Sequence, residues 1–246
     1  MLEEAPGCRG RTRCARLVGV SPWWISLGAL AGLGAVQVLL PHLIKQVQLA
    51  SLARRARGRL ILSYDDGPWA GLTPAVLDLL RARGARASFF LIGSKVEAEP
   101  QLAGRLAAEG HEVGSHSSRH PHPWRTDPVR LGLDLARGHR QLTAAGLQPT
   151  GYRPQYGKVV GTTWLWSLLR GQPLRWWTHD SGDSQGERDP AAVVARVRAS
   201  GGGVVLLHDG VGEGDRARFV VETTAALLDL AEEQGWQVGG FEVLEG

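Results

Sequence analysis

The sequence predicts an α/β fold in which parallel strands alternate with helices, preceded by one N-terminal membrane-spanning helix. Between residues 59 and 246, short apolar runs alternate with stretches that have the apolar period of an amphipathic helix. Such alternation is typical of parallel strands joined by helical crossovers, in either an open doubly wound sheet or a closed barrel. Upstream, residues 17–44 contain no Lys, Arg, Asp or Glu. Both architectures bind ligands at the carboxyl ends of their strands, so functional residues are expected there.

The apolar segment 17–44 is longer than the roughly 20 residues that a membrane-spanning helix needs. We therefore predict a basic tail over 1–16, a membrane anchor over 17–44, a basic linker over 45–58 and a catalytic domain over 59–246. The alternative is a cleaved signal peptide with a small-residue site at 51–53, but that site lies well beyond the apolar run. Basic residues flank the segment on both sides, so the charge rule leaves its orientation open.

The charge distribution argues against nucleic-acid binding. The net charge is +4, but residues 1–58 hold eight Lys or Arg and two Glu, and the rest of the chain is slightly acidic. A basic excess beside an apolar helix favours membrane headgroups as its partner. Both cysteines, Cys8 and Cys14, precede the apolar segment. The predicted catalytic domain therefore has no thiolate with which to bind a metal or form a disulfide.

The first strand of the predicted domain lies within residues 59–68, RLILSYDDGP. Its apolar run indicates a strand buried on both faces, and Gly67-Pro68 ends it because proline cannot donate to a ladder. Asp65 and Asp66 therefore stand at the carboxyl end of a strand. Successive side chains of an extended backbone point to opposite sides, so one carboxylate can bind a metal while the other handles a proton. The alternative is an ordinary solvated turn.

The later elements follow from the same alternation of patterns. Gly110 closes one helix in the position of a left-handed cap, and Pro100 opens it. With the first strand, the predicted strands number seven. The remaining strands are predicted at 87–92, 112–114, 150–153, 174–179, 203–207 and 236–243. The helices are predicted at 74–83, 100–109, 127–145, 162–170, 191–199 and 218–234.

Histidines follow the third predicted strand at a spacing that metal sites use. His116 and His120 are four residues apart in GSHSSRHPHP, so a helical turn or tight loop would bring both imidazoles to one side. Together with Asp66 at a neighbouring strand end, they would provide two nitrogens and one carboxylate and leave one position open. Taken alone, a pair of histidines is often polar surface. His122 lies close enough in sequence to be mistaken for a third imidazole ligand.

Further polar residues close the later strands. Arg153 begins RPQYG, where a fixed cation can hold a catalytic carboxylate, although a surface salt bridge is the alternative. Asp180 and Asp183 follow the fifth strand, and His208 ends the sixth. Taken alone, a histidine at the end of a buried strand is more often a core residue with its hydrogen bonds satisfied than a catalytic group.

In their order along the chain, these segments resemble the motifs of the polysaccharide deacetylase family, also called carbohydrate esterase family four. The likeness runs from Arg59 to the C-terminus. Gln155 stands where the family's Arg-Pro-Pro-Tyr-Gly motif has its second proline. The matching segments are 63–68 (SYDDGP), 87–93 (ASFFLIG), 110–120 (GHEVGSHSSRH), 153–157 (RPQYG), 180–183 (DSGD) and 206–208 (LLH). The resemblance implies a distorted (β/α) barrel of about seven parallel strand–helix units.

Carried over residue by residue, the resemblance implies a division of labour between the two adjacent acids. Asp65 is expected to act as the general base, oriented by Arg153. Asp66, His116 and His120 are expected to bind a divalent metal. Zinc suits one carboxylate and two imidazoles, and cobalt or nickel would also bind.

The resemblance also implies a general acid and an oxyanion site. His208 is expected to donate the proton that an amine leaving group needs, with Asp183 adjusting its proton affinity. The backbone amide of Tyr156 is expected to face the developing oxyanion. Ser184 departs from the family pattern, which has tryptophan directly after the second aspartate of this motif. An aromatic wall of the substrate pocket would then have to come from another tryptophan, with Trp69, Trp124, Trp176 and Trp177 as candidates.

The resemblance leads us to expect a metal-dependent hydrolase that removes N-acetyl groups from a glycan containing N-acetylglucosamine, such as peptidoglycan or chitin. Alternatives are a sugar O-acetyl esterase, a deacylase of a lipid-linked sugar, and a catalytically dead glycan-binding protein tethered to the membrane. We expect a monomer, with the catalytic domain outside the cytoplasmic membrane or, after signal cleavage, secreted.

Overall fold

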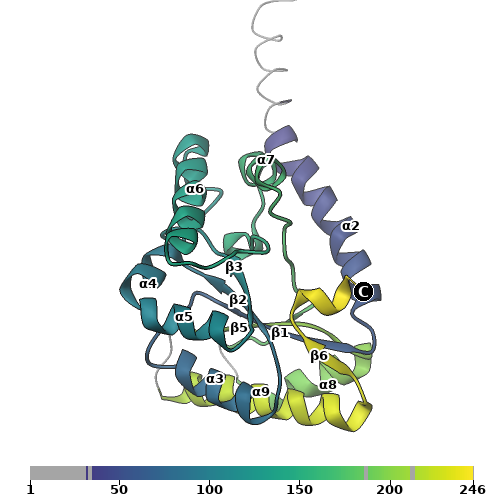
Figure 1. Ribbon diagram of the computed structural model, residues 1–246. Helices are drawn as coiled ribbons and strands as arrows, with labels where there is room; N and C mark the ends of the chain where they lie inside the picture. The colour runs from purple at the N-terminus through teal and green to yellow at the C-terminus, as the bar shows by residue number, and fades with distance from the viewer. Residues whose placement is uncertain (1–31, 33–34, 186–187, 211–213, 246) are drawn as a thin grey trace, which may run out of the picture.

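The computed structural model describes residues 32, 35–185, 188–210 and 214–245. Its described strands form one parallel sheet in the order β3-β2-β1-β5-β4, with β6 beside the first half of β1 (Figure 1). The strands are β1 (Arg59–Asp65), β2 (Ser88–Leu91), β3 (Glu112–Ser115), β4 (His179–Asp180), β5 (Gly203–His208) and β6 (Gln237–Gly239). The pairings confirm the predicted α/β class, because every strand runs parallel to its neighbour.

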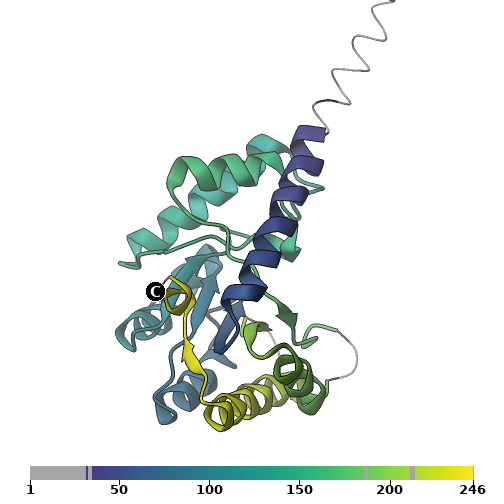
Figure 2. The same cartoon turned by 90° about the vertical axis from the view of Figure 1, so that its right-hand side faces the viewer.

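Helices cover the sheet in two groups. In Figure 1, α3, α8 and α9 lie below the strands, whereas α6, α7 and α2 lie above them. Figure 2 shows α2 running obliquely from the end beside α7 down to the sheet. The helices are α2 (Leu40–Arg55), α3 (Thr73–Ala82), α4 (Gly93–Ala98), α5 (Pro100–Ala108), α6 (Pro128–Ala144), α7 (Gly161–Arg170), α8 (Pro190–Ser200) and α9 (Asp215–Gln234). A π-helical turn η1 (Ala35–Leu39) leads into α2, and 3₁₀ turns form at η2 (Gln155–Gly157) and η3 (Phe241–Leu244).

The alternation of side chains along β1 explains how the core and the site share one strand. Leu60, Leu62 and Tyr64 pack with α3 and α9 in the main core, and the Tyr64 hydroxyl lies 2.8 Å from Thr224 Oγ1 of α9. Ser63 and Asp65 point to the other face, where both accept hydrogen bonds from one guanidinium. The same strand therefore anchors the fold with one face and presents a carboxylate with the other.

Three predicted strands are shorter than expected, and the one predicted at 174–179 forms only a bridge at Leu174 and the two-residue β4. Residues 150–153 form isolated bridges through Tyr152, to Ser115 on one side and Leu174 on the other. Prolines at 149 and 154 bound the segment and cannot donate to a ladder, so pairing does not extend further. The last strand stops at Gly239 because the chain turns into η3. Since the segment after Leu174 leads to β4, which pairs with β5, these bridges complete a circuit of parallel strands.

The segment 45–58, predicted as a basic linker, is largely helical. It lies mostly within α2, where Leu52 is 4% exposed and packs with Ile61 and Trp176. Leu52 and Ala56 are four residues apart, so they lie on one face and are buried together. The many basic residues around them make this narrow apolar face hard to recognise in the sequence. Most of the predicted anchor 17–44 lies outside the described residues. No helix among those that are described is long and apolar enough to cross a membrane.

Candidate active site

The predicted functional residues gather at the carboxyl ends of the parallel strands. Asp65 ends β1 and His208 ends β5, and the two are direct partners in the strand register. His116 follows β3 directly. Together with residues from the connecting loops they line a cleft of about 360 Å³. The lining residues are Asp65, Asp66, His116, His120, Tyr156, Lys158, Trp177, Asp180, Ser184, Gln185, Leu206, His208 and Arg216.

Asp65 is held by a fully buried arginine. Arg153 Nη1 donates to Asp65 Oδ1 at 2.8 Å and to Ser63 Oγ at 2.9 Å, and the arginine side chain has no exposure to solvent. The guanidinium also lies over the ring of Phe90, 4.0 Å from its centroid. Asp65 is 3% exposed. A buried charge pair with further hydrogen bonds fixes the carboxylate in one orientation, so the alternative of a surface salt bridge for Arg153 is excluded.

Asp66, His116 and His120 bring three ligand atoms together. Asp66 Oδ1 lies 3.5 Å from His116 Nε2 and 3.4 Å from His120 Nε2, and the three atoms lie within 4.8 Å of one another. His116 Nδ1 donates to the carbonyl oxygen of Arg153 at 2.7 Å. Because a carbonyl can only accept, this bond places the ring proton on Nδ1 and leaves the Nε2 lone pair facing the carboxylate.

The chemistry of this set fits a divalent metal ion. Asp66 Oδ1 is buried and has no hydrogen-bond partner among the described residues, and such an oxygen is costly unless a cation or donor binds it. Burial lowers the pKa of His120 to about 4, and the nearby His116 acts in the same direction against the opposing charges of Asp66 and Asp65. Its imidazole is therefore neutral at physiological pH, as metal binding requires.

Left-handed backbone conformations concentrate around the site. Within the described part of the chain, the non-glycine residues with positive φ are Asp66 (71°), Ser117 (71°), His120 (57°) and Tyr156 (56°). Such conformations cost of order 1–2 kcal/mol each for most side chains. Three of these residues line the cleft directly. The surrounding structure therefore holds the loops in conformations that turn these side chains toward one another.

His208 has a carboxylate partner on its other ring nitrogen. Asp183 is fully buried, and its Oδ1 accepts from His208 Nδ1 at 2.8 Å while its Oδ2 accepts from the His208 backbone N–H at 2.8 Å. Burial lowers the pKa of His208, but the hydrogen bond that its ring donates to Asp183 and the charges of Asp183, Asp65 and Asp66 raise it to about 9. The imidazole is therefore protonated at neutral pH and presents Nε2–H to the cleft.

Aromatic side chains form one wall of the cleft. The exposed Tyr156 ring lies between two imidazoles, with centroids 4.6 Å from His120 and 5.0 Å from His122. His122 lies outside the group of candidate ligands, since its Nε2 accepts from Lys158 Nζ at 2.9 Å. Of the four tryptophans proposed as substitutes at the position of Ser184, only Trp177 lines the described part of the cleft.

Two cationic residues of the cleft were not predicted. Lys158 follows the RPQYG segment by one residue, and Arg216 lies in the first turn of α9, 3.8 Å from Asp183 Oδ2. Each follows a recognised motif in the sequence, and this nearness to a motif was the only sign in the sequence that either residue reaches the cleft. A third missed residue is Asp209, next to His208, whose burial raises its pKa to about 7 and whose Oδ2 accepts from Thr73 Oγ1 at 2.5 Å.

Comparison with known proteins identifies the family. Residues 53–169 match the family model for polysaccharide deacetylases. The chain is 31% identical over 181 residues to a peptidoglycan-N-acetylglucosamine deacetylase of Bacillus cereus, over 72% of this chain and 84% of that protein. It is 32% identical over 195 residues to the peptidoglycan-N-acetylglucosamine deacetylase PgdA of Listeria monocytogenes, which covers 76% of this chain but only 39% of the Listeria protein.

Solved structures agree with this assignment. A family 4 carbohydrate esterase from Streptomyces lividans, in complex with acetate, superposes with a TM-score of 0.66 at 26% identity, over 75% of this chain and 93% of the other. The family-model match over residues 53–169 includes Asp65, Asp66, His116, His120 and Arg153. The chain therefore belongs to the polysaccharide deacetylase family.

Proposed function

We propose that the protein is a metal-dependent deacetylase that removes N-acetyl groups from a glycan containing N-acetylglucosamine. The observation that supports this most strongly is that one cleft holds both a fixed carboxylate, Asp65, and a protonated imidazole, His208. Asp65, fixed by Arg153, lies beside the three candidate metal ligands. His208, protonated through Asp183, lies at the adjoining strand end. Amide hydrolysis needs both a base for the attacking water and an acid for the departing amine.

The residues of the chain have distinct roles in this mechanism. Asp65 removes a proton from the water as its oxygen bonds to the acetyl carbon. The backbone amide of Tyr156 faces the negative charge that develops on the carbonyl oxygen. His208 donates a proton to the nitrogen as the C–N bond breaks, which releases acetate and a free amino sugar. Asp183 keeps His208 charged and holds its ring by Nδ1, so that Nε2–H is the proton donated.

Asp66, His116 and His120 would hold the metal. A bound divalent ion supplies Lewis-acid chemistry, because it polarises the acetyl carbonyl and lowers the pKa of water. The donor set of two imidazoles and one carboxylate favours zinc, and cobalt or nickel also suit it. The orientation of His116 by the Arg153 carbonyl connects this metal site to the base, since the same arginine fixes Asp65.

The relatives support an N-acetyl glycan as the substrate class. Those compared above are named peptidoglycan-N-acetylglucosamine deacetylases, and another, 35% identical over 159 residues, is the chitooligosaccharide deacetylase of a Bradyrhizobium strain. A sugar O-acetyl ester is the second candidate, because an ester needs less help from an acid and Ser184 leaves the substrate side of the cleft more open. A dead glycan-binding protein is disfavoured, since each proposed ligand and proton-transfer residue is present.

A membrane-anchored location outside the cytoplasmic membrane is part of the same proposal. The uncharged segment 17–44 and the extracytoplasmic nature of cell-wall glycans support it. Protease added to intact spheroplasts of cells that express the full chain should digest the catalytic domain. Full protection of the domain would contradict this location.

The activity is tested by acetate release from N-acetylglucosamine oligomers, from peptidoglycan and from acetylated xylan. We expect release from the N-acetylated substrates, its loss after chelation, and its recovery when zinc is added. Release from xylan alone would support the esterase. No release from any substrate by a protein that retains zinc would favour the glycan-binding alternative.

A further inference from the structure

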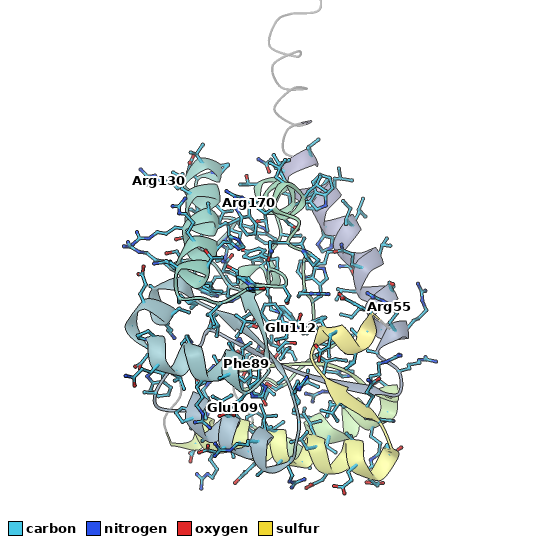
Figure 3. All side chains as sticks on the ribbon, in the orientation of Figure 1. Arg55, Phe89, Glu109, Glu112, Arg130 and Arg170 are labelled. Carbon is cyan, nitrogen blue, oxygen red and sulfur yellow. The ribbon has the colours of Figure 1, made fainter. Side chains whose placement is uncertain are left out.

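Helix α2 lies mostly outside the matched family region but packs beside the loop that carries Tyr156 and Gly157. The family match begins at residue 53, within the last turn of a helix that starts at Leu40. In Figure 3, α2 runs from the end beside α7 to the end marked by Arg55. Midway along it, two side chains contact the segments that carry Arg153, Tyr156 and Trp177. The contacts join parts of the chain more than 100 residues apart.

Lys45 makes the contact nearest to the site. Its Nζ donates to the carbonyl oxygen of Gly157 at 2.7 Å, and it lies 4.8 Å from the centroid of the Trp176 ring and 5.9 Å from that of Trp177. Within the described residues no carboxylate pairs with this ammonium group. Its charge is therefore satisfied by one backbone carbonyl and two aromatic faces, an arrangement that fixes the position of the carbonyl.

Gln48 extends the same contact by one helical turn. Trp176 Nε1 donates to Gln48 Oε1 at 2.7 Å, and Lys45 and Gln48 lie on one face because they are three residues apart. Leu52, a further turn along, is buried against Trp176. The face of α2 is thus fixed to the tryptophan pair at three successive levels, so Lys45 is presented by a rigid element and not by a flexible tail.

The loop that Lys45 contacts needs such support. Tyr156 and Gly157 are consecutive left-handed residues, with φ of 56° and 61°, and a tyrosine adopts this conformation only at a cost in free energy. An added Cβ at Gly157 would lie 2.7 Å from the Trp177 ring, so tryptophan packs directly against the backbone there. The carbonyl bound by Lys45 belongs to the residue immediately after Tyr156.

We propose that Lys45 is a positioning residue of the active site, which acts by holding the Gly157 carbonyl so that the Tyr156 turn keeps its left-handed conformation in the cleft. Helix α2 is then a working part of the catalytic domain. The kinetic consequence rests on the proposed deacetylase function, in which the Tyr156 amide faces the oxyanion. The conformational consequence does not, because it concerns only the loop 155–158.

The test replaces Lys45 with methionine, which keeps the length of the side chain and removes the donor. The full chain is studied with zinc added, and Lys45→Arg retains a donor. Arg54→Met is the matched control, because Arg54 is an exposed basic residue of the same helix whose side chain has no hydrogen bond or ion pair among the described residues. The readouts are kcat and KM for acetate release, zinc content, and amide hydrogen exchange resolved by peptide.

For Lys45→Met we expect kcat to fall about 10-fold with KM nearly unchanged. The reason is that the Tyr156 amide, which the substitution would displace, acts in the transition state. Exchange should rise in the peptide that spans 155–158, zinc content should stay the same, and Lys45→Arg should recover much of the loss. Arg54→Met should match the wild type. Unchanged exchange at 155–158, or faster exchange across the whole domain, would overturn the proposal. If the wild type releases no acetate, the deacetylase assignment fails, while the exchange result still decides the role of Lys45.

Discussion

Two histidines of one cleft differ in proton affinity although they are similarly buried. The His120 side chain is 21% exposed and that of His208 is 16% exposed. Burial lowers the pKa of both, yet the pKa of His120 falls to about 4 whereas that of His208 rises to about 9. The difference lies in the partner, because Asp183 Oδ1 is 2.8 Å from His208 Nδ1 while the carboxylate nearest to His120 is 3.4 Å away and also faces His116.

The comparison teaches that a hydrogen-bonded carboxylate decides what a buried imidazole can do. Without one, His120 stays neutral and offers a lone pair, which suits a metal ligand. With one, His208 stays charged and offers a proton, which suits a general acid. The cleft thus separates the proposed metal ligands from the proposed general acid, and Asp65 lies between them as a register partner of His208 and 3.9 Å from His116 Nε2.

The largest expected effect comes from removing a proposed metal ligand. His120→Ala should lose bound zinc and activity together, down to the limit of detection, while the fold persists because the side chain lies outside the main core. Elemental analysis and circular dichroism measure the two parts. His122→Ala is the matched control, since that neighbouring imidazole is not among the candidate ligands. Stoichiometric zinc in His120→Ala would refute the ligand assignment.

The next effect depends on the leaving group. His208→Ala should lower kcat/KM about 10²-fold or more on an N-acetyl substrate, in the usual range for a lost general acid. An activated aryl ester leaves as a stable anion, so its hydrolysis should suffer much less. Steady-state kinetics on both substrates, with zinc content checked, gives the comparison. Equal losses on amide and ester would remove His208 from the acid role.

Asp183→Asn should lower the pKa of His208, so that this imidazole becomes more like that of His120. Burial would then be opposed only by the charges of Asp65 and Asp66, so the pKa of His208 should fall from about 9 toward the ordinary value of about 6.5. Above that pH the imidazole loses the proton that the wild type keeps until about pH 9. The ratio of wild-type to variant kcat on the amide should therefore be larger at pH 8 than at pH 5.5. A ratio that does not vary with pH would contradict this link.

The smallest expected effect concerns substrate contact near the proposed general acid. Ser184→Trp restores the aromatic residue that the family pattern has at this exposed position of the cleft. Since an aromatic contact contributes about 0.5–1.5 kcal/mol, KM should fall by a few-fold to about 10-fold with kcat little changed. The measurement is KM for an N-acetylglucosamine oligomer. A rise in KM would indicate that Trp177 already fills this space.

The sequence predicted the parts of the site that sit at strand ends, because strand ends are visible as the points where apolar runs stop. Asp65, His116 and His208 are of this kind, and the structure brings them into one cleft. The roles assigned to them remain predictions. The division of tasks between Asp65 and Asp66 also came from the sequence, through the family resemblance and the alternation of side chains.

Contacts between distant segments could not be predicted in this way. Lys45 and Gly157 are 112 positions apart, and the basic residues near Lys45 suggested a linker because the buried edge of α2 is narrow. The short α4 was missed since six residues give too few turns for a periodic pattern. The length of the strand at 150–153 was overestimated. The apolar pattern of the segment does not show that Ser115 and Leu174 pair with Tyr152 alone.

Helix α2 would also set the distance between the catalytic domain and the membrane surface. A helix of 16 residues is about 24 Å long. Its middle is attached to the domain by the contacts of Lys45 and Gln48. If the segment 17–44 is held in a bilayer, as proposed, the remaining part of α2 would keep the cleft at one distance and tilt above the lipid surface. A flexible tether would let the cleft sample every layer within its reach. Such an enzyme would modify glycan strands at one depth of the wall and leave those nearer or farther acetylated.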